Sequence, residues 1–246
     1  MMSLAEPNFI DITQKQYQYK LKAYLNFLLT MIAVQAMALL FSSGGVGQMS
    51  MGVGNVSLSM RTFSGDIIVI FTGFWSLVVA IFITTKEYRD GDFILTANRR
   101  STNLANIAYL LTVSILAGVT AILGSVFLRV MQYFLLGPEQ IAATNFFITP
   151  REFILTVTVA SLYFILLAAI GYFIGSLVQF NKSFIIVLPG LFFGSLIISD
   201  AVILVDALSF FLEETSFVIL VVKIMVVAVV LFTSATLLSD RLEVRV

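Results

Sequence analysis

The chain has 246 residues, of which 59% are hydrophobic and 11% are charged, against about 25% charged residues in an ordinary soluble domain, so the composition predicts an integral membrane protein. Basic and acidic residues balance to a net charge of zero, which gives no electrostatic reason to expect nucleic acid as a partner. Cysteine and histidine are both absent, which excludes disulfide bonds, thiol nucleophiles and the usual zinc ligands, and removes the commonest general base.

Residues 1–22 precede the first long apolar run and are predicted to form a basic amphipathic helix. Apolar and aromatic side chains recur there, and into the run, at spacings of four, three and four: Tyr17, Leu21, Tyr24 and Leu28. The lysines are expected on other faces: Lys15, Lys20 and Lys22. Such a helix would lie in the cytoplasmic headgroup region and steer entry into the membrane. The alternative is a solvated extension of the first crossing.

Six apolar runs within residues 23–238 are long enough to cross the hydrocarbon layer, which is about 30 Å thick and needs about 20 helical residues. They cover residues 23–41, 67–85, 104–128, 153–178, 184–204 and 217–238. None shows the alternating pattern of a barrel strand, and lipid requires every backbone amide to be bonded within its segment. The predicted fold is therefore all-α, with six transmembrane helices and a short tail at 239–246.

The distribution of basic residues predicts the orientation of the chain. Six crossings place both termini on one side, together with ten basic residues: Lys15, Lys20, Lys22, Lys86, Arg89, Arg99, Arg100, Lys182, Arg241 and Arg245. The other side carries three: Arg61, Arg129 and Arg151. The positive-inside rule then puts both termini in the cytoplasm of a cell-membrane protein.

Three connections are predicted on the outer side. Residues 42–62 are rich in glycine, which predicts an irregular loop, and no phosphate-binding glycine motif occurs there. Residues 129–152 form the second connection. Residues 205–216 mix Asp206, Glu213 and Glu214 with apolar side chains, which suits a short helix at the outer interface or a plain loop.

The most concentrated charge lies between the second and third crossings, in the sequence TKEYRDGDFILTANRRSTN. Its Phe93, Ile94 and Leu95 can bury against the bundle while the flanking charges face water or a partner, which predicts a short cytoplasmic helix within 86–103. Gly91 permits a sharp turn. The alternative is an ordinary positive-inside loop.

This connection resembles the corresponding loop of ABC-2 type ABC transporter permeases, in which an acidic residue, a glycine and a basic residue bracket a coupling helix. The matching positions are Glu87, Tyr88, Arg89, Asp90 and Gly91, followed by an apolar triplet and by Arg99 and Arg100. The chain departs from the family at Asp92, where threonine is common, and at Ala97 and Asn98, where a proline often precedes the basic residue. The resemblance implies that residues 87–92, Arg99 and Arg100 couple to the ATPase. The amphipathic N-terminal segment, the six crossings and the cytoplasmic ends extend the resemblance over essentially the whole chain. Relatives of similar size serve lantibiotic immunity or export amphipathic peptides, and others move drugs or lipids.

The resemblance implies a division of labour. No Walker A sequence occurs in this chain, so ATP and Mg²⁺ are expected in a separate ATPase subunit that docks on the charged connection, and no cofactor is expected here. A second permease chain, identical or related, would complete the path for a hydrophobic or amphipathic cargo. Closure of the ATPase pair would then shift the crossings between two arrangements.

Features within the crossings have more than one interpretation. Pro189 beside Gly190 should kink the fifth crossing, as a static bend or as a gating hinge. The small residues Gly171, Gly175, Gly190 and Gly194 favour close packing of helices, within the chain or between subunits. Lys223 lies in the last crossing and would snorkel to the outer headgroups, contact cargo or pair with a carboxylate. The candidate partners are Asp200, Asp206, Glu213 and Glu214, with Asp206 placed first.

Other functions were weighed against the exporter subunit. A membrane enzyme is disfavoured because Asp66 and Asp200 are far apart in the sequence and no histidine is available. A noncatalytic anchor that recruits soluble partners, or a non-ABC secondary transporter, remains the alternative, although no internal repeat supports the latter.

Overall fold

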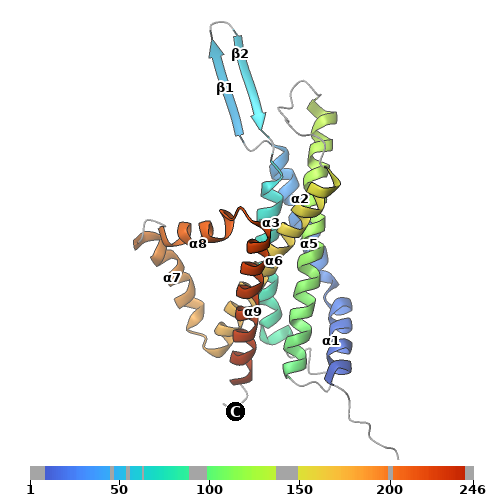
Figure 1. The fold of residues 1–246 in the computed structure, drawn as a ribbon, viewed down its shortest axis with the longest axis vertical. Coiled ribbons are helices and arrows are strands. Elements are labelled where there is room, and N and C mark those ends of the chain that lie inside the picture. The colour runs from blue at the N-terminus through green and yellow to red at the C-terminus, as the bar shows by residue number, and fades with distance from the viewer. Residues whose placement is uncertain are drawn as a thin grey trace, which may run out of the picture. The chain divides into compact units, whose positions relative to one another are not determined.

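The structure is a computed structural model that describes residues 9–44, 47–53, 56–62, 64–88, 99–136, 149–198 and 202–241. It is helical apart from one two-stranded hairpin (Figure 1). The chain divides into two compact units. Unit 1 contains Met1–Ala23, Leu77–Leu111 and Ile165–Val246, and unit 2 contains Tyr24–Ser76 and Thr112–Phe164.

The described elements are, in chain order, α1 (Phe9–Ala23), α2 (Leu25–Ser43), β1 (Gly47–Val53), β2 (Val56–Thr62), α3 (Asp66–Thr84), α5 (Arg99–Leu136), α6 (Pro150–Phe180), α7 (Phe184–Ile198), α8 (Val202–Leu212) and α9 (Phe217–Arg241). Within the described residues, five helices are long and apolar enough to cross a membrane: α2, α3, α5, α6 and α9. The chain is therefore a helical, multi-pass membrane protein.

These five helices coincide with five of the six predicted crossings. The predicted fifth crossing at 184–204 differs, because the helix α7 ends at Ile198 and α8 begins at Val202. With 15 residues, α7 rises about 22 Å, less than the roughly 30 Å of the hydrocarbon layer. In Figure 1, α7 and α8 meet at an angle, and α8 leads to α9. Where the sequence predicts one crossing, the described residues thus form two shorter helices.

Local hydrogen bonds account for several helix ends. Thr149 and Glu152 form a capping box at the start of α6: the Thr149 N–H donates to Glu152 Oε2 at 3.0 Å, and the Glu152 N–H donates to Thr149 Oγ1 at 3.3 Å. Pro150 occupies the first helical position, where its missing N–H costs nothing. Ser64 accepts the Asp66 N–H at 3.1 Å, and this fixes Asp66 at the helix boundary.

The irregular loop predicted for 42–62 is wrong. Strands β1 and β2 pair antiparallel in a regular register, from Gly47 opposite Thr62 to Val53 opposite Val56. Pairing between the two strands satisfies the backbone groups of a segment whose glycine content alone favours irregular structure. α5 also extends to Leu136, into the first part of the outer connection predicted at 129–152.

The core of unit 2 is built around buried polar contacts between helices. Gln35 of α2 donates through Nε2 to Thr72 Oγ1 of α3 at 3.3 Å and to Thr120 Oγ1 of α5 at 3.0 Å. Trp75 Nε1 donates to Thr30 Oγ1 at 3.0 Å, joining α3 to α2 a second time. Gln35 is therefore a helix-to-helix contact, as expected of a polar residue within a crossing.

In unit 1, α6 packs closely on the second half of α3. A Cβ atom on Gly171 would collide with the backbone carbonyl of Leu77 and would lie 3.1 Å from Ala80 Cβ. A Cβ on Gly175 would collide with the Thr84 hydroxyl and lie 3.2 Å from the Ile81 carbonyl oxygen. These two glycines pack within the chain, whereas Gly190 and Gly194 of α7 have nothing within 4 Å of a Cβ position among the described residues.

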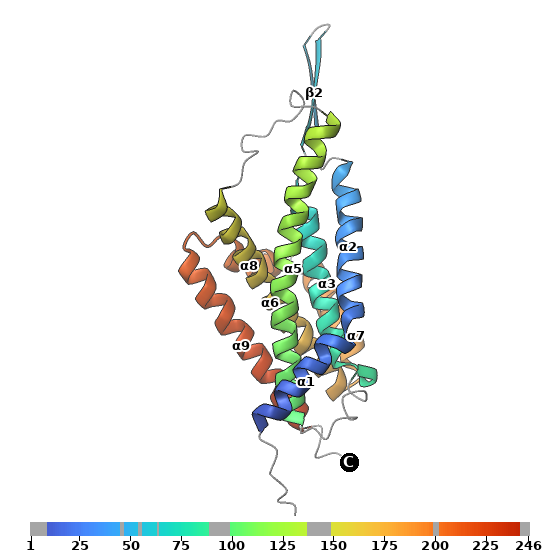
Figure 2. The same cartoon turned by 90° about the vertical axis from the view of Figure 1, so that its right-hand side faces the viewer.

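The face of α1 that packs differs from the predicted one. Gln16 and Lys20 are buried, at 2% and 0% exposure, while Tyr17 and Leu21 are partly exposed. Gln16 Nε2 donates to Thr102 Oγ1 at 3.2 Å, which fixes α1 across the first turns of α5 (Figure 2). Lys20 therefore does not lie on a solvated face, because tertiary contact overrides the apolar periodicity.

We predict that Gly171→Ala destabilises the protein by about 1 to 3 kcal/mol, because the added methyl group must displace the α3 backbone. Gly194→Ala is the matched control and should be neutral or slightly stabilising, since its surroundings are open and alanine favours helix. Thermal unfolding in detergent, followed by circular dichroism, measures both. Equal losses in the two variants would contradict the packing argument.

Candidate coupling site

The charged connection leaves α3 and enters α5 at one end of unit 1. A helical turn at 86–88 carries Glu87 and Tyr88, and α5 begins with Arg99 and Arg100. Glu87 and Arg100 are exposed, whereas Tyr88 and Arg99 are partly buried. The remaining predicted coupling residues lie outside the described residues: Arg89, Asp90, Gly91 and Asp92. The predicted coupling helix itself therefore stays a prediction.

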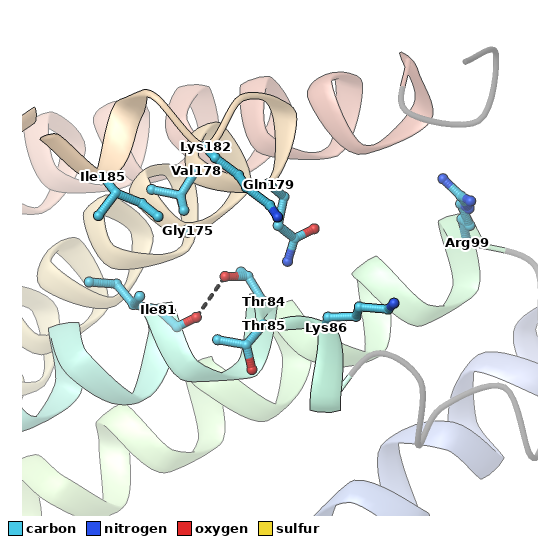
Figure 3. Close-up of a pocket in the computed structure, with 10 residues that line it drawn as sticks. All are labelled: Ile81, Thr84, Thr85, Lys86, Arg99, Gly175, Val178, Gln179, Lys182 and Ile185. Atoms are coloured by element: carbon cyan, nitrogen blue, oxygen red, sulfur yellow. Dashed lines mark hydrogen bonds between the residues drawn. The ribbon is translucent and has the colours of Figure 1, made fainter. Parts of the chain in front are cut away.

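A pocket of about 480 Å³ opens beside this connection (Figure 3). Its lining comes from the end of α3, the first residue of α5, the end of α6 and the start of α7: Ile81, Thr84, Thr85, Lys86, Arg99, Gly175, Val178, Gln179, Lys182 and Ile185. Three of these residues are cationic and none is acidic, whereas Ile81, Val178 and Ile185 supply apolar surface. The pocket therefore suits an anion with an apolar part.

The turn between α6 and α7 fixes the position of Lys182 in this pocket. Asn181 accepts the Ser183 N–H through Oδ1 at 3.0 Å, and the Asn181 carbonyl accepts the Phe184 N–H at 3.1 Å. The Lys182 carbonyl accepts the Ile185 N–H at 3.1 Å. An asparagine side chain that bonds the backbone two residues on is typical of a tight turn into a helix. This geometry holds Lys182 at the corner.

A buried polar cluster ties the start of α5 to α6. Tyr172 Oη donates to Asn103 Oδ1 at 3.0 Å and accepts from Asn106 Nδ2 at 3.5 Å. The Tyr172 ring also packs on Phe232 of α9, with ring centroids 5.9 Å apart. Sequence reasoning missed this cluster, although two asparagines three residues apart at the start of an apolar helix are a signal for a shared buried face.

The candidate hinge lies in an exposed helix. Pro189 is inside α7, where it removes one backbone donor. Pro189 and Gly190 are both exposed, and the apolar side chains around them are exposed too, as in Ile186 at 79%. Contacts of the described residues therefore do not constrain this part of α7. Its role as static bend or hinge stays a prediction.

Lys223 forms an ion pair with Glu214, not with Asp206. Its Nζ also donates to the Phe210 carbonyl at 2.8 Å and lies 3.8 Å from the centroid of the Phe210 ring. The Lys223 and Glu214 side chains are 15% and 25% exposed. Glu214 was among the predicted candidates, and the choice of Asp206 was wrong because the residues after α8 return toward α9 and carry Glu214 to the lysine. The pair links the end of α8 to α9.

No potential metal site, defined as three or more clustered histidine, cysteine, aspartate or glutamate side chains, occurs among the described residues. Comparison of the chain with protein-family models, curated proteins and solved structures finds no match. Evidence for the function therefore comes from the residues of this chain and their arrangement.

We predict that Lys223→Met weakens the attachment of α8, because it leaves the partly buried Glu214 carboxylate unpaired, at a cost of about 1 to 3 kcal/mol. Amide hydrogen exchange in residues 202–212 should accelerate. Asp206→Asn, which alters an exposed carboxylate on the same helix, should leave the exchange unchanged. If amide exchange accelerated only in the Asp206→Asn variant, Asp206 and not Glu214 would be the partner of Lys223.

Proposed function

We propose that this chain is the transmembrane permease subunit of an ATP-driven exporter of the ABC-2 type. A separate ATPase subunit would bind the charged connection at 86–103, and a second permease chain would complete the path. In this proposal both termini and the connection are cytoplasmic, consistent with the excess of basic residues on that side.

The observation that carries the proposal is the attachment of both ends of the charged connection to one helix, α6. Immediately before the connection, Thr84 of α3 lies against Gly175. At the last residue of the connection, Asn103 of α5 accepts a hydrogen bond from Tyr172. A force applied to the connection would therefore act on α3, α5 and α6 together. That arrangement suits the transfer of a rigid-body movement from a soluble ATPase to a helical bundle.

An apolar groove in unit 1 supports a hydrophobic or amphipathic cargo. The groove has a volume of about 300 Å³ between α5, α6 and α9, and its lining includes Leu104, Ile107, Ile165, Met225, Val229 and Phe232. None of the described residues that line it is charged. Such a surface selects poorly among ions and favours greasy molecules.

The proposal predicts that an ATPase copurifies with the chain from its native membrane in a mild detergent. Glu87→Lys combined with Arg100→Glu should lower the copurified ATP hydrolysis by about tenfold or more, since reversed charges repel the complementary surface of the partner. Both side chains are exposed, so the fold should survive.

The control is the charge reversal Arg151→Glu combined with Asp206→Lys, at two exposed positions away from the connection. Hydrolysis should be unchanged in this variant. An ATPase could instead copurify with an activity that neither pair of substitutions changes, while reconstituted vesicles move no cargo. That result would favour the noncatalytic anchor.

The orientation can be measured directly because the chain contains no cysteine. Glu87→Cys should react with a membrane-impermeant maleimide only after the cells are permeabilised. Glu213→Cys, at an exposed position after α8, should react in intact cells. Labelling of Glu87→Cys in intact cells would refute the cytoplasmic position of the connection and the proposed docking of an ATPase.

A further inference from the structure

The pocket between the end of α3, the start of α5 and the end of α6 is lined by three basic side chains, which the export function does not require. One space is lined by Lys86 and Arg99, from either side of the charged connection, and by Lys182, from the turn between α6 and α7 (Figure 3). We propose that this pocket binds the headgroup of an anionic phospholipid. The inference does not depend on the export function, because the site would be occupied whether or not an ATPase binds.

The charge of the pocket is the first argument. Three cationic side chains and no acidic one are among the described residues that line it. Lys86 and Lys182 are both exposed, and the neutral donors Thr85 and Gln179 add hydrogen-bonding capacity. A phosphate diester carries one negative charge and several acceptor oxygens. Ammonium and guanidinium groups converging from different segments match that chemistry.

The level of the pocket is the second argument. α3 has 19 residues, which gives a length of about 28 Å and nearly matches the hydrocarbon thickness. Thr84, its last residue, lines the pocket. The three cations therefore lie where α3 meets the headgroup layer. Basic pockets between transmembrane helices at this level are typical sites for acidic lipid headgroups.

The apolar part of the lining separates a lipid from a free anion. Ile81 and Val178 line the same space as the cations, and Ile185 joins them from the start of α7. Ile185 and the next residue Ile186 are exposed, at 56% and 79%. Inorganic phosphate would gain nothing from these side chains, whereas acyl chains attached to a bound headgroup would cover them.

Native mass spectrometry of the full chain tests the site without an ATPase. The protein is released from nanodiscs that contain equal amounts of dioleoyl phosphatidylglycerol and dioleoyl phosphatidylcholine, and the retained lipids are counted. We expect wild-type protein to retain phosphatidylglycerol preferentially. Lys86→Ala combined with Lys182→Ala should lower that preference by about tenfold or more.

Lys15→Ala combined with Lys22→Ala is the control, because it removes the same charge from two exposed positions of α1 and should lower the preference far less than the pocket variant does. An equal preference in wild type and in the pocket variant would overturn the proposal, as would no preference in wild type. Displacement of the retained lipid by millimolar inorganic phosphate would also overturn it, in favour of a free-anion site.

Discussion

The close approach of α6 to α3 is the constraint on which the organisation of unit 1 depends. Lipid provides no hydrophobic drive to bring two apolar helices together, so contact depends on packing and on polar bonds. Gly171 and Gly175 allow the backbone of α3 to lie where side chains would otherwise stand. Because Thr84 is part of this contact, the point at which the charged connection leaves the bundle is fixed as well.

Buried polar residues set the alignment of the helices in each unit. Tyr172 holds Asn103 and Asn106 in unit 1, and Gln35 joins three helices in unit 2. Hydrogen bonds between membrane helices contribute about 0.6 kcal/mol each on average. Their effect is therefore greater on which residues face each other than on total stability. A sliding or rotated helix would leave these side chains buried without partners.

The sequence predicted the crossings within a few residues at α2, α3 and α9, because the cost of exposing backbone amides to lipid ties helix length to the length of the apolar run. The sequence underestimated the length of α5, since a helix can continue past the hydrocarbon layer, where apolar composition no longer marks its end. It merged α7 and α8 because both are apolar. Glu214 was one of the candidate partners of Lys223, but Asp206 was placed first, because the sequence does not show that the turn after α8 decides which carboxylate reaches Nζ.

Trp75 gives this molecule a built-in optical reporter. It is the single tryptophan of the chain, is 6% exposed and donates its indole N–H to Thr30. The Thr30 hydroxyl in turn donates to the Phe27 carbonyl at 2.8 Å. Separation of α2 from α3 would break the bond between Trp75 and Thr30 and expose the indole ring to solvent. The colour of the native emission therefore reports rearrangement of that helix pair, without an attached dye.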